Sequence, residues 1–239
     1  MSGTLAIIAK DEARYTMFWV CVLNVMSNAP ANTRWDIGIS TDIAGARNHL
    51  VQRSLDEGSE WIAFVDDDMN FPSDLLKRLL AHEVDIVGAP YLRRAGEHSP
   101  LAFSGRNEDG LYDPIDLTEL PGEGLLKVYA MGAGCMLIRS EVFRAISSEP
   151  NWFEHGRVHG RDWNAAEDII FCEKANEAGF DIYVDLGTPV GHMAPSAVWP
   201  SYIDKEWAVG FSVADGTRLY VPIEKAADAA DAVKEAISG

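Results

Sequence analysis

Short apolar runs alternate with amphipathic stretches along most of the chain. Runs of about five apolar residues, bounded by polar or glycine-containing segments, are typical of strands buried in a parallel sheet. We predict such strands at residues 5–9, 35–39, 61–65, 85–89 and 181–185. Stretches that suit helices fall at residues 15–26, 44–57, 73–82 and 167–178. This alternation predicts an α/β fold, with a mostly parallel sheet flanked by helices and a smaller antiparallel portion.

The middle and the end of the chain lack this regular alternation. Residues 93–124 are polar and rich in turn residues, which predicts loops or short antiparallel strands, and a β segment resumes within residues 126–139. Residues 150–166 have no periodicity, and we interpret them as a long loop of the kind that is often functional. We expect a single domain over residues 1–223 and a peripheral, alanine-rich helix over residues 224–239.

The charge balance restricts the classes of partner. The 239 residues include 20 Lys and Arg against 37 Asp and Glu, a formal charge of −17. Nucleic acid and anionic membranes should repel such a chain, whereas phosphates remain accessible if a metal ion carries positive charge. No apolar run reaches the ~18–20 residues of a membrane span. Three cysteines without CxxC spacing indicate reduced thiols in a cytoplasmic protein.

The strongest candidate for chemistry is the acidic segment Asp66-Asp67-Asp68, directly after the predicted buried strand at residues 61–65. Adjacent carboxylates repel one another unless solvent or a cation relieves them. Ligands of open α/β sheets bind beyond the carboxyl ends of the strands, and Mg²⁺ and Mn²⁺ prefer oxygen ligands. A solvated turn that caps the next helix is the alternative, but the position after a buried strand favours a metal site.

Two further candidates come later in the chain, around the last predicted helix and the last predicted strand. Glu167 and Asp168 occupy the first turn of a predicted helix, where they either complement the helix dipole or supply a general base. The dipole should keep Asp168 ionised, with reduced intrinsic basicity. His192, in a loop after the last predicted strand, is either structural or a ligand that suits Mn²⁺ beside carboxylates.

Two weaker signals come from glycines and from one arginine. Gly132 and Gly134 flank Ala133 in a strand-like segment, which indicates either a bulge or close approach of a ligand to the backbone. The chain has neither GxGxxG after its first strand nor a GxxxxGK[ST] loop. Arg47, in a predicted helix, could pair with a phosphate or equally with a surface carboxylate.

Taken in order, these segments resemble the GT-A glycosyltransferases, and most of all the small family-2-like enzymes of phages and bacteria. The resemblance spans roughly residues 5–195 and rests on the segments ARN, DDDM, IVGAPYLRR, GAGCMLIRS, EDIIFC, AGFDIYVD and GH. It implies a GT-A, Rossmann-like fold. It also implies that Asp66 and Asp68 form a D-x-D motif for Mn²⁺ or Mg²⁺, with Asp68 as the direct ligand and His192 completing the site.

The resemblance also assigns roles to other residues. It implies that Asp168, next to Glu167 in the ED motif, is the base of an inverting enzyme, and that residues 151–164 form a lid over the donor. The implied contacts with the nucleotide-sugar are Ile8, Ala9, Asp11, Arg47, Asp66, Asp67, Asp68, Gly132, Ala133 and Gly134. The first strand lacks the Pro-x-[Tyr/Phe]-Asn pattern of typical members, so the choice of nucleotide base stays open.

The function expected from this resemblance is transfer of a sugar, such as a hexose, from a UDP- or GDP-sugar to an acceptor hydroxyl. A cytoplasmic location is expected, in the host if a phage encodes the protein. Three alternatives remain: a phage-type enzyme acting on hypermodified DNA bases, a non-catalytic nucleotide-sugar-binding protein, and a nucleotidyltransferase. The sequence leaves the acceptor and the oligomeric state open. We find no basic amphipathic helix of the kind that attaches proteins to membranes.

Overall fold

The computed structural model describes residues 1–9, 15–94, 99–108, 110–146, 151–157, 164–194, 196–203, 206–213 and 218–222. The chain divides into two compact units. Met1–Arg93 and Ser99–His192 form the first, and Arg94–His98 and Met193–Gly239 form the second. Asp11 and the helix expected over residues 224–239 lie outside the described residues.

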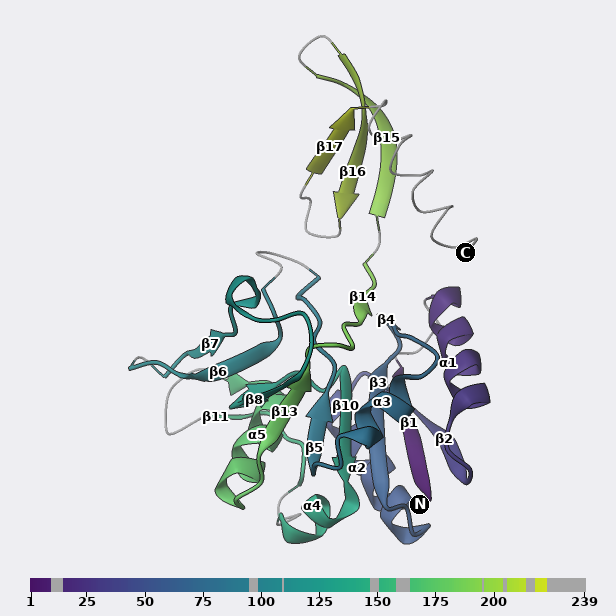
Figure 1. Cartoon of the computed structure of the whole chain (residues 1–239), viewed down its shortest axis with the longest axis vertical. Coiled ribbons are helices and arrows are strands. Elements are labelled where there is room, and N and C mark those ends of the chain that lie inside the picture. Colours follow the sequence, from purple (N-terminus) through teal and green to yellow (C-terminus); the bar gives the residue numbers. More distant parts are fainter. Residues whose placement is uncertain are drawn as a thin grey trace. The chain divides into compact units, whose positions relative to one another are not determined.

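A seven-stranded sheet forms the centre of the first unit (Figure 1). Its order is β2 (Thr33–Ile39), β1 (Gly3–Ala9), β3 (Trp61–Asp66), β10 (Cys135–Arg139), β5 (Ile86–Gly88), β13 (Ile182–Asp185) and β8 (Leu125–Val128). Only β10 and β8 run against the direction of the other strands. The predicted α/β fold with a mostly parallel sheet is therefore confirmed.

Helices flank this sheet (Figure 1). They are α1 (Thr16–Asn28), α2 (Ile43–Asp56), α3 (Leu75–Ala81), α4 (Ser140–Ala145) and α5 (Glu167–Glu177). A short 3₁₀ turn, η1 (Leu117–Glu119), precedes β8 in the chain. Helix α2 begins where the Asp42 carboxylate accepts a hydrogen bond from the Gly45 N–H at 3.0 Å, an ordinary N-cap. Its Ala46, Leu50 and Val51 are buried, and the helix packs on β1 and β2.

Short antiparallel sheets complete the first unit. The chain at residues 93–124 contributes β6 (Ala102–Arg106) and β7 (Tyr112–Pro114), which pair with β9 (Ala130–Met131) in the order β7-β6-β9. This confirms the predicted short antiparallel strands. Two pairs were not predicted: β11 (Gly156–Arg157) with β12 (Asn164–Ala165), and β4 (Met69–Asn70) with β14 (Gly191–His192).

The segment expected to form a lid begins inside the core. Trp152 and Phe153 are buried, and the Phe153 ring stacks on Phe171 of α5 at 4.7 Å between centroids. The Asn48 amide donates to the Phe153 carbonyl at 2.7 Å and accepts from its N–H at 3.0 Å. Two aromatic side chains therefore anchor the start of this segment in the core, and the lid over residues 151–164 stays a prediction. Residues 158–163 lie outside the described part.

The second unit contains an antiparallel meander that the hydrophobic pattern did not predict. It consists of β15 (Ser196–Ile203), β16 (Glu206–Val213) and β17 (Arg218–Pro222), in that order. Across the described ranges, none of the helices is long and apolar enough to traverse a bilayer. The three cysteines are buried free thiols, as expected for a protein that does not use them in disulfides.

Candidate active site

The acidic segment lies where three strands of the main sheet meet. Asp66 is the last residue of β3, and its N–H donates to the Gly134 carbonyl at 3.0 Å. Ile8 of β1 is the register partner of Asp66, and its carbonyl accepts from the Asp67 N–H at 2.9 Å. Ile8 and Ala9 are buried, so they flank the acidic segment chiefly through their backbone.

Arg47 is at the centre of the site rather than at its surface. Its side chain is 2% exposed, and its guanidinium pairs with Asp66 at 2.8 Å and with Glu167 at 3.3 Å. A third donor reaches the Ala133 carbonyl at 3.3 Å, and the guanidinium lies 5.2 Å from the Phe64 ring centroid. We expected a phosphate or a surface carboxylate as its partner, but its partners are the half-buried Asp66 and the buried Glu167. Arg47 thereby ties α2 to β3 and to α5.

Burial and charge shift the acidity of the groups around Arg47. Burial raises the pKa of Asp66 to about 6, although Arg47 acts in the opposite direction. The pKa of Arg47 is raised because its neighbouring carboxylates outweigh burial, which alone would lower it. The guanidinium is therefore a permanent cation that offsets part of the buried negative charge.

The Gly132-Ala133-Gly134 turn is shaped by Tyr91, which follows β5. The Gly134 N–H donates to the Tyr91 hydroxyl oxygen at 3.0 Å. A Cβ atom on Gly132 would lie 2.1 Å from the same oxygen, and one on Gly134 would lie 2.4 Å from the Met69 methyl group. Close packing therefore disfavours a side chain at both positions unless Tyr91 or Met69 shifts. Tyr91 was not among the predicted site residues, because its sequence signal is just an aromatic residue after the predicted strand at residues 85–89.

Asp168 stands at the start of α5, directly against the glycine turn. Its carboxylate accepts hydrogen bonds from the Ala133 N–H at 3.2 Å and from its neighbour Ile169 at 2.8 Å. Burial and the adjacent Glu167 nevertheless raise its pKa to about 6. The expectation of reduced basicity is wrong, because burial outweighs the backbone donors. Glu167, by contrast, is buried and committed to Arg47.

His192 reaches the acidic segment through the pairing of β14 with β4. In that pair His192 lies opposite Met69, and Met69 directly follows Asp68 in the chain. Its Nδ1 donates to the Leu92 carbonyl at 3.0 Å, and its ring packs edge-on against Tyr91 at 5.6 Å. This hydrogen bond orients the ring so that Nε2 faces Asp68, and the nearest carboxylate oxygen of Asp68 lies 3.5 Å from Nε2.

The donor set of Asp68 and His192 can be tested against a divalent metal. Within the described ranges, no group of three or more His, Cys, Asp or Glu residues is arranged to hold a metal ion. One carboxylate and one imidazole nitrogen nevertheless suit Mn²⁺, which commonly takes its other ligands from water and substrate phosphates. Asp66 suits it less, because one of its oxygens is paired with Arg47.

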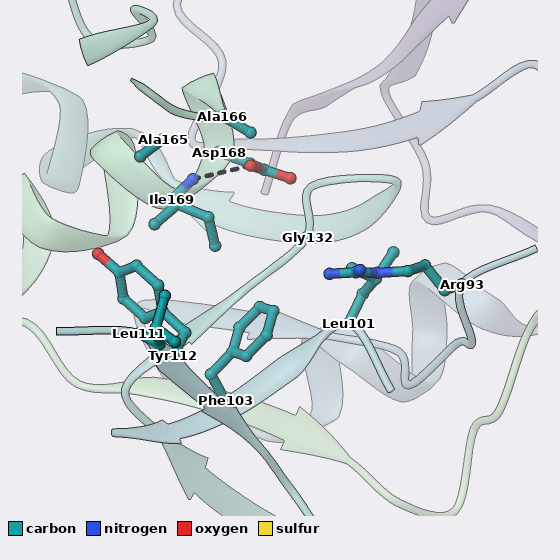
Figure 2. A pocket seen from close by; sticks show the side chains of 10 residues that line it. All are labelled: Arg93, Leu101, Phe103, Leu111, Tyr112, Gly132, Ala165, Ala166, Asp168 and Ile169. Carbon is teal, nitrogen blue, oxygen red and sulfur yellow. Dashed lines mark hydrogen bonds between the residues drawn. The ribbon is translucent and has the colours of Figure 1, made fainter. Parts of the chain in front are cut away.

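Asp168 also faces a pocket of about 430 Å³ in the first unit (Figure 2). Apolar side chains make up most of its wall, and Gly132 contributes backbone to it. Its lining residues are Arg93, Leu101, Phe103, Leu111, Tyr112, Gly132, Ala165, Ala166, Asp168 and Ile169. Among the described residues, the Asp68–His192 pair and the base candidate Asp168 lie on either side of the glycine turn.

Known structures resemble this chain in fold, whereas known sequences do not match it. No protein-family model matches the sequence, and no curated protein sequence matches it. A crystal structure of GalNAc-T7 with UDP, GalNAc and Mn²⁺ has a TM-score of 0.52 at 11% identity, covering 80% of this chain and 44% of that chain. The chain has a fold of the nucleotide-sugar transferase type.

Two other similar structures are more distant in TM-score. A197 from STIV gives 0.48 at 12% identity, covering 92% of this chain and 94% of that one. Apo UDP-glucose pyrophosphorylase gives 0.41 at 13% identity, covering 79% and 74%. At these identities the likeness concerns the fold. The residues of the site described above are therefore the basis for any statement about function.

Proposed function

We propose that this protein is a metal-dependent, inverting glycosyltransferase that moves a sugar from a nucleotide-diphosphate sugar to an acceptor hydroxyl. The observation that carries the proposal is the arrangement around one glycine turn. A carboxylate with its pKa raised to about 6 lines a pocket at one end of the turn, and an aspartate–histidine pair stands beyond the other. The proposed reaction needs a base beside the acceptor and a cation site beside the diphosphate. Asp168 at the pocket and the Asp68–His192 pair near the strand ends could supply them.

In this proposal the donor lies across the carboxyl ends of β1 and β3. Ile8 and Ala9 contact the nucleotide through their backbone, while Asp67 and the glycine turn approach the sugar and diphosphate. Arg47 is buried on Asp66 and Glu167, and so acts by holding the acidic segment against α5 rather than by touching the donor.

Asp68 and His192 are the residues that would hold Mn²⁺ or Mg²⁺. When bound, the ion would offset the charge that develops on the leaving diphosphate. The Leu92 carbonyl, by accepting the Nδ1 proton, keeps the His192 ring oriented with Nε2 toward Asp68. An overall charge of −17 makes such an ion the natural source of positive charge for an anionic donor.

Asp168 is proposed as the general base. The proton of the acceptor hydroxyl passes to its carboxylate while the acceptor oxygen attacks the sugar carbon. The Ala133 N–H fixes the carboxylate in place at 3.2 Å, and a pKa of about 6 leaves it ionised at neutral pH yet basic enough to accept a proton. Glu167 keeps its contact with Arg47 and serves as a positioning residue.

The test begins with thermal-shift measurements against UDP- and GDP-sugars, with Mn²⁺ and with a chelator. A donor that stabilises the protein only with the cation is then incubated with candidate acceptors, and the products are separated. Release of nucleoside diphosphate with a glycosylated acceptor supports the proposal, and the anomeric configuration of the product distinguishes inversion from retention.

Other products would point elsewhere. Pyrophosphate release from a nucleoside triphosphate and a sugar phosphate would instead make the protein a nucleotidyltransferase. Cation-dependent binding of a nucleotide-sugar with no turnover on any acceptor would leave a non-catalytic binding protein. Either result would overturn the proposed reaction.

A further inference from the structure

One aromatic side chain, Tyr91, contacts both halves of the proposed site. It follows β5 in the chain and is 7% exposed. Its hydroxyl oxygen accepts a hydrogen bond from the Gly134 N–H at 3.0 Å. Its ring lies edge-on to the His192 ring, with 5.6 Å between the centroids. One residue therefore contacts both the glycine turn beside Asp168 and the imidazole proposed as a cation ligand.

The hydroxyl of Tyr91 helps to fix one peptide unit of the glycine turn, the unit that joins Ala133 to Gly134. Its N–H donates to Tyr91, and its carbonyl accepts from the buried Arg47 at 3.3 Å. Because a peptide unit is planar, these two contacts on opposite edges set the direction of the whole plane. The preceding peptide unit shares the Cα atom of Ala133, and its N–H donates to the Asp168 carboxylate at 3.2 Å. Removing the hydroxyl should therefore loosen the hold of the turn on Asp168.

The ring of Tyr91 acts on His192 together with the carbonyl of Leu92. That carbonyl accepts from Nδ1 of His192 at 3.0 Å, which still allows the imidazole to tilt about the hydrogen bond. The Tyr91 ring stands at 88° to the imidazole, and an edge-to-face contact of this kind favours one tilt. In this orientation Nε2 lies 3.5 Å from a carboxylate oxygen of Asp68. The ring therefore helps to keep the two proposed cation ligands side by side.

We infer that Tyr91 is a positioning residue with two separable roles: its hydroxyl orients Asp168 through the glycine turn, and its ring orients His192. The inference rests on the proposed function for the roles of Asp168 and His192, although both orientations can be measured without the reaction. Packing alone is the simpler explanation of a buried tyrosine. Packing requires the ring but not the hydroxyl, so substitutions that remove one or both distinguish the two explanations.

Tyr91→Phe keeps the ring and removes the hydroxyl. We expect kcat for sugar transfer to fall at least about tenfold, because the base is less well oriented. KM for the donor and the Mn²⁺-dependent affinity for UDP or GDP should stay within about twofold, because the cation ligands keep their places. A parental kcat would overturn the role of the hydroxyl, as would a loss that appears in KM alone.

Hydrogen exchange measures the same role with no substrate present. In Tyr91→Phe the Gly134 amide loses its acceptor, and the Ala133 amide loses part of its hold on Asp168. We expect both amides to exchange at least about tenfold faster in NMR experiments, relative to amides of β1 that report opening of the whole sheet. Faster exchange at Gly134 with unchanged exchange at Ala133 would contradict a link to Asp168.

Tyr91→Leu removes the ring as well as the hydroxyl. Calorimetry with UDP and GDP should show Mn²⁺-dependent affinity about fivefold weaker than in Tyr91→Phe, because His192 loses its edge-to-face contact. Without nucleotide or metal, ¹⁵N NMR of the His192 ring should match the parent in Tyr91→Phe and differ in Tyr91→Leu. Equal affinities and equal His192 spectra in both variants would overturn the role of the ring. Tyr91→Met, with a flexible side chain that fills the same space, replaces the leucine variant if that one does not fold.

The matched control makes the same chemical change in the strand next to β5. Tyr183 of β13 places its hydroxyl 3.4 Å from the Asp181 carboxylate in an exposed contact. Tyr183→Phe should leave kcat, amide exchange in the glycine turn and nucleotide affinity within about twofold of the parent, because a contact at the surface contributes little. Changes as large as those in Tyr91→Phe would show that loss of any tyrosine hydroxyl in this sheet has the same effect, and would overturn the inference.

The inference and the proposed function can fail separately. If the substitutions alter the Ala133 amide and the His192 ring as expected while the parent transfers no sugar, the positioning role stands and the proposed reaction fails. If the parent transfers sugar and Tyr91→Phe does so at the parental rate, the glycosyltransferase proposal stands and the hydroxyl of Tyr91 does not position the base.

Discussion

At the residue scale, Asp168 shows how two opposing effects set the properties of one carboxylate. Backbone N–H donors favour its ionised form, whereas burial and Glu167 favour its protonated form, and the balance raises its pKa to about 6. Because the base must be ionised to accept a proton, kcat/KM for transfer should rise as pH increases through about 6 and then level off. Initial rates across a pH series at saturating Mn²⁺ measure this limb.

Replacing the base gives the complementary test. Asp168→Asn should lower kcat by about 10²–10⁴-fold and remove the rising limb of the pH profile, while donor affinity stays within a few-fold. The exposed Asp74→Asn variant serves as the control, because its side chain only pairs with Arg78 within α3 and the turn before it. Transfer that survives in Asp168→Asn would show that another group accepts the proton.

The Asp68–His192 pair supports a separate prediction about the nucleotide. Asp68→Ala should abolish the part of nucleotide affinity that depends on Mn²⁺, and His192→Ala should weaken it, because each removes one of two adjacent donors. Calorimetry with UDP and GDP, with and without Mn²⁺, measures both. Asp74→Ala is a suitable control for removal of an exposed aspartate. Unchanged Mn²⁺-dependent affinity in Asp68→Ala would contradict this role.

The sequence could indicate some of these residues and not others, for a physical reason. Asp66, Asp68 and Asp168 stand at a strand end or a helix start, and such positions follow from local hydrophobic pattern. The partner of Arg47 could not be predicted this way, because Glu167 is 120 residues away along the chain. Only the packing of α2 and α5 on the same sheet brings the two side chains together.

At the scale of elements, Arg47 holds three of them in one arrangement. Its side chain links α2 to the end of β3 and the start of α5 through Asp66 and Glu167. Arg47→Met keeps the volume but leaves two carboxylates facing an apolar neighbour. We expect it to lower the free energy of unfolding by about 3–5 kcal/mol, as measured by urea denaturation at neutral pH.

The control for this variant lies on the same helix. Arg53 also forms two ion pairs, with Asp36 and Glu57, but its side chain is 54% exposed. Arg53→Met should therefore cost no more than about 1 kcal/mol. If both variants lost the same small amount, Arg47 would not be the link between the elements.

The glycine turn between β9 and β10 supports a prediction of steric origin. In Gly132→Ala the new Cβ would meet the Tyr91 hydroxyl oxygen at 2.1 Å, so we expect a loss of about 1–3 kcal/mol in the free energy of unfolding. Adding Tyr91→Phe removes that oxygen and should recover part of the loss, although it also deletes an acceptor for Gly134. Thermal or urea unfolding of the single and double variants measures the coupling.

A matched glycine tests whether the effect comes from contact. A Cβ on Gly122 would meet nothing within 4 Å, so Gly122→Ala should leave stability within about 0.5 kcal/mol of the parent. Loss of equal size at both positions, or full additivity of Gly132→Ala and Tyr91→Phe, would rule out the steric explanation.

The elements themselves were predictable to different degrees. β1, β3 and α5 could be located closely because continuous apolar runs and helix-start carboxylates mark them in the sequence. The pairing of β4 with β14 could not, since each strand has two residues and carries no periodic pattern. That pairing is nevertheless what places His192 beside Asp68.

At the scale of the whole molecule, the meander β15–β17 was missed although its strands have five to eight residues. Pro200 lies within β15 and Gly210 within β16, and both residue types weaken a strand pattern in the sequence. The net charge, by contrast, follows directly from the full sequence. It supports a prediction about DNA as an acceptor.

A net charge of −17 should prevent the protein from binding duplex DNA through the phosphate backbone of the DNA. Non-specific binding depends on Lys and Arg neutralising phosphates, and the chain has 20 such residues against 37 carboxylates. Arg78, a half-exposed cation of α3, is already paired with Asp74. We expect a dissociation constant weaker than about 10⁻⁴ M for a fluorescent duplex in anisotropy titrations at about 0.1 M salt.

Varying the salt completes this test and bears directly on the acceptor. If phosphate contacts contributed, affinity would increase steeply as salt is lowered, whereas for this chain lower salt should strengthen the repulsion. Tight duplex binding with a steep salt dependence would contradict this prediction and would favour a modified DNA base as the acceptor.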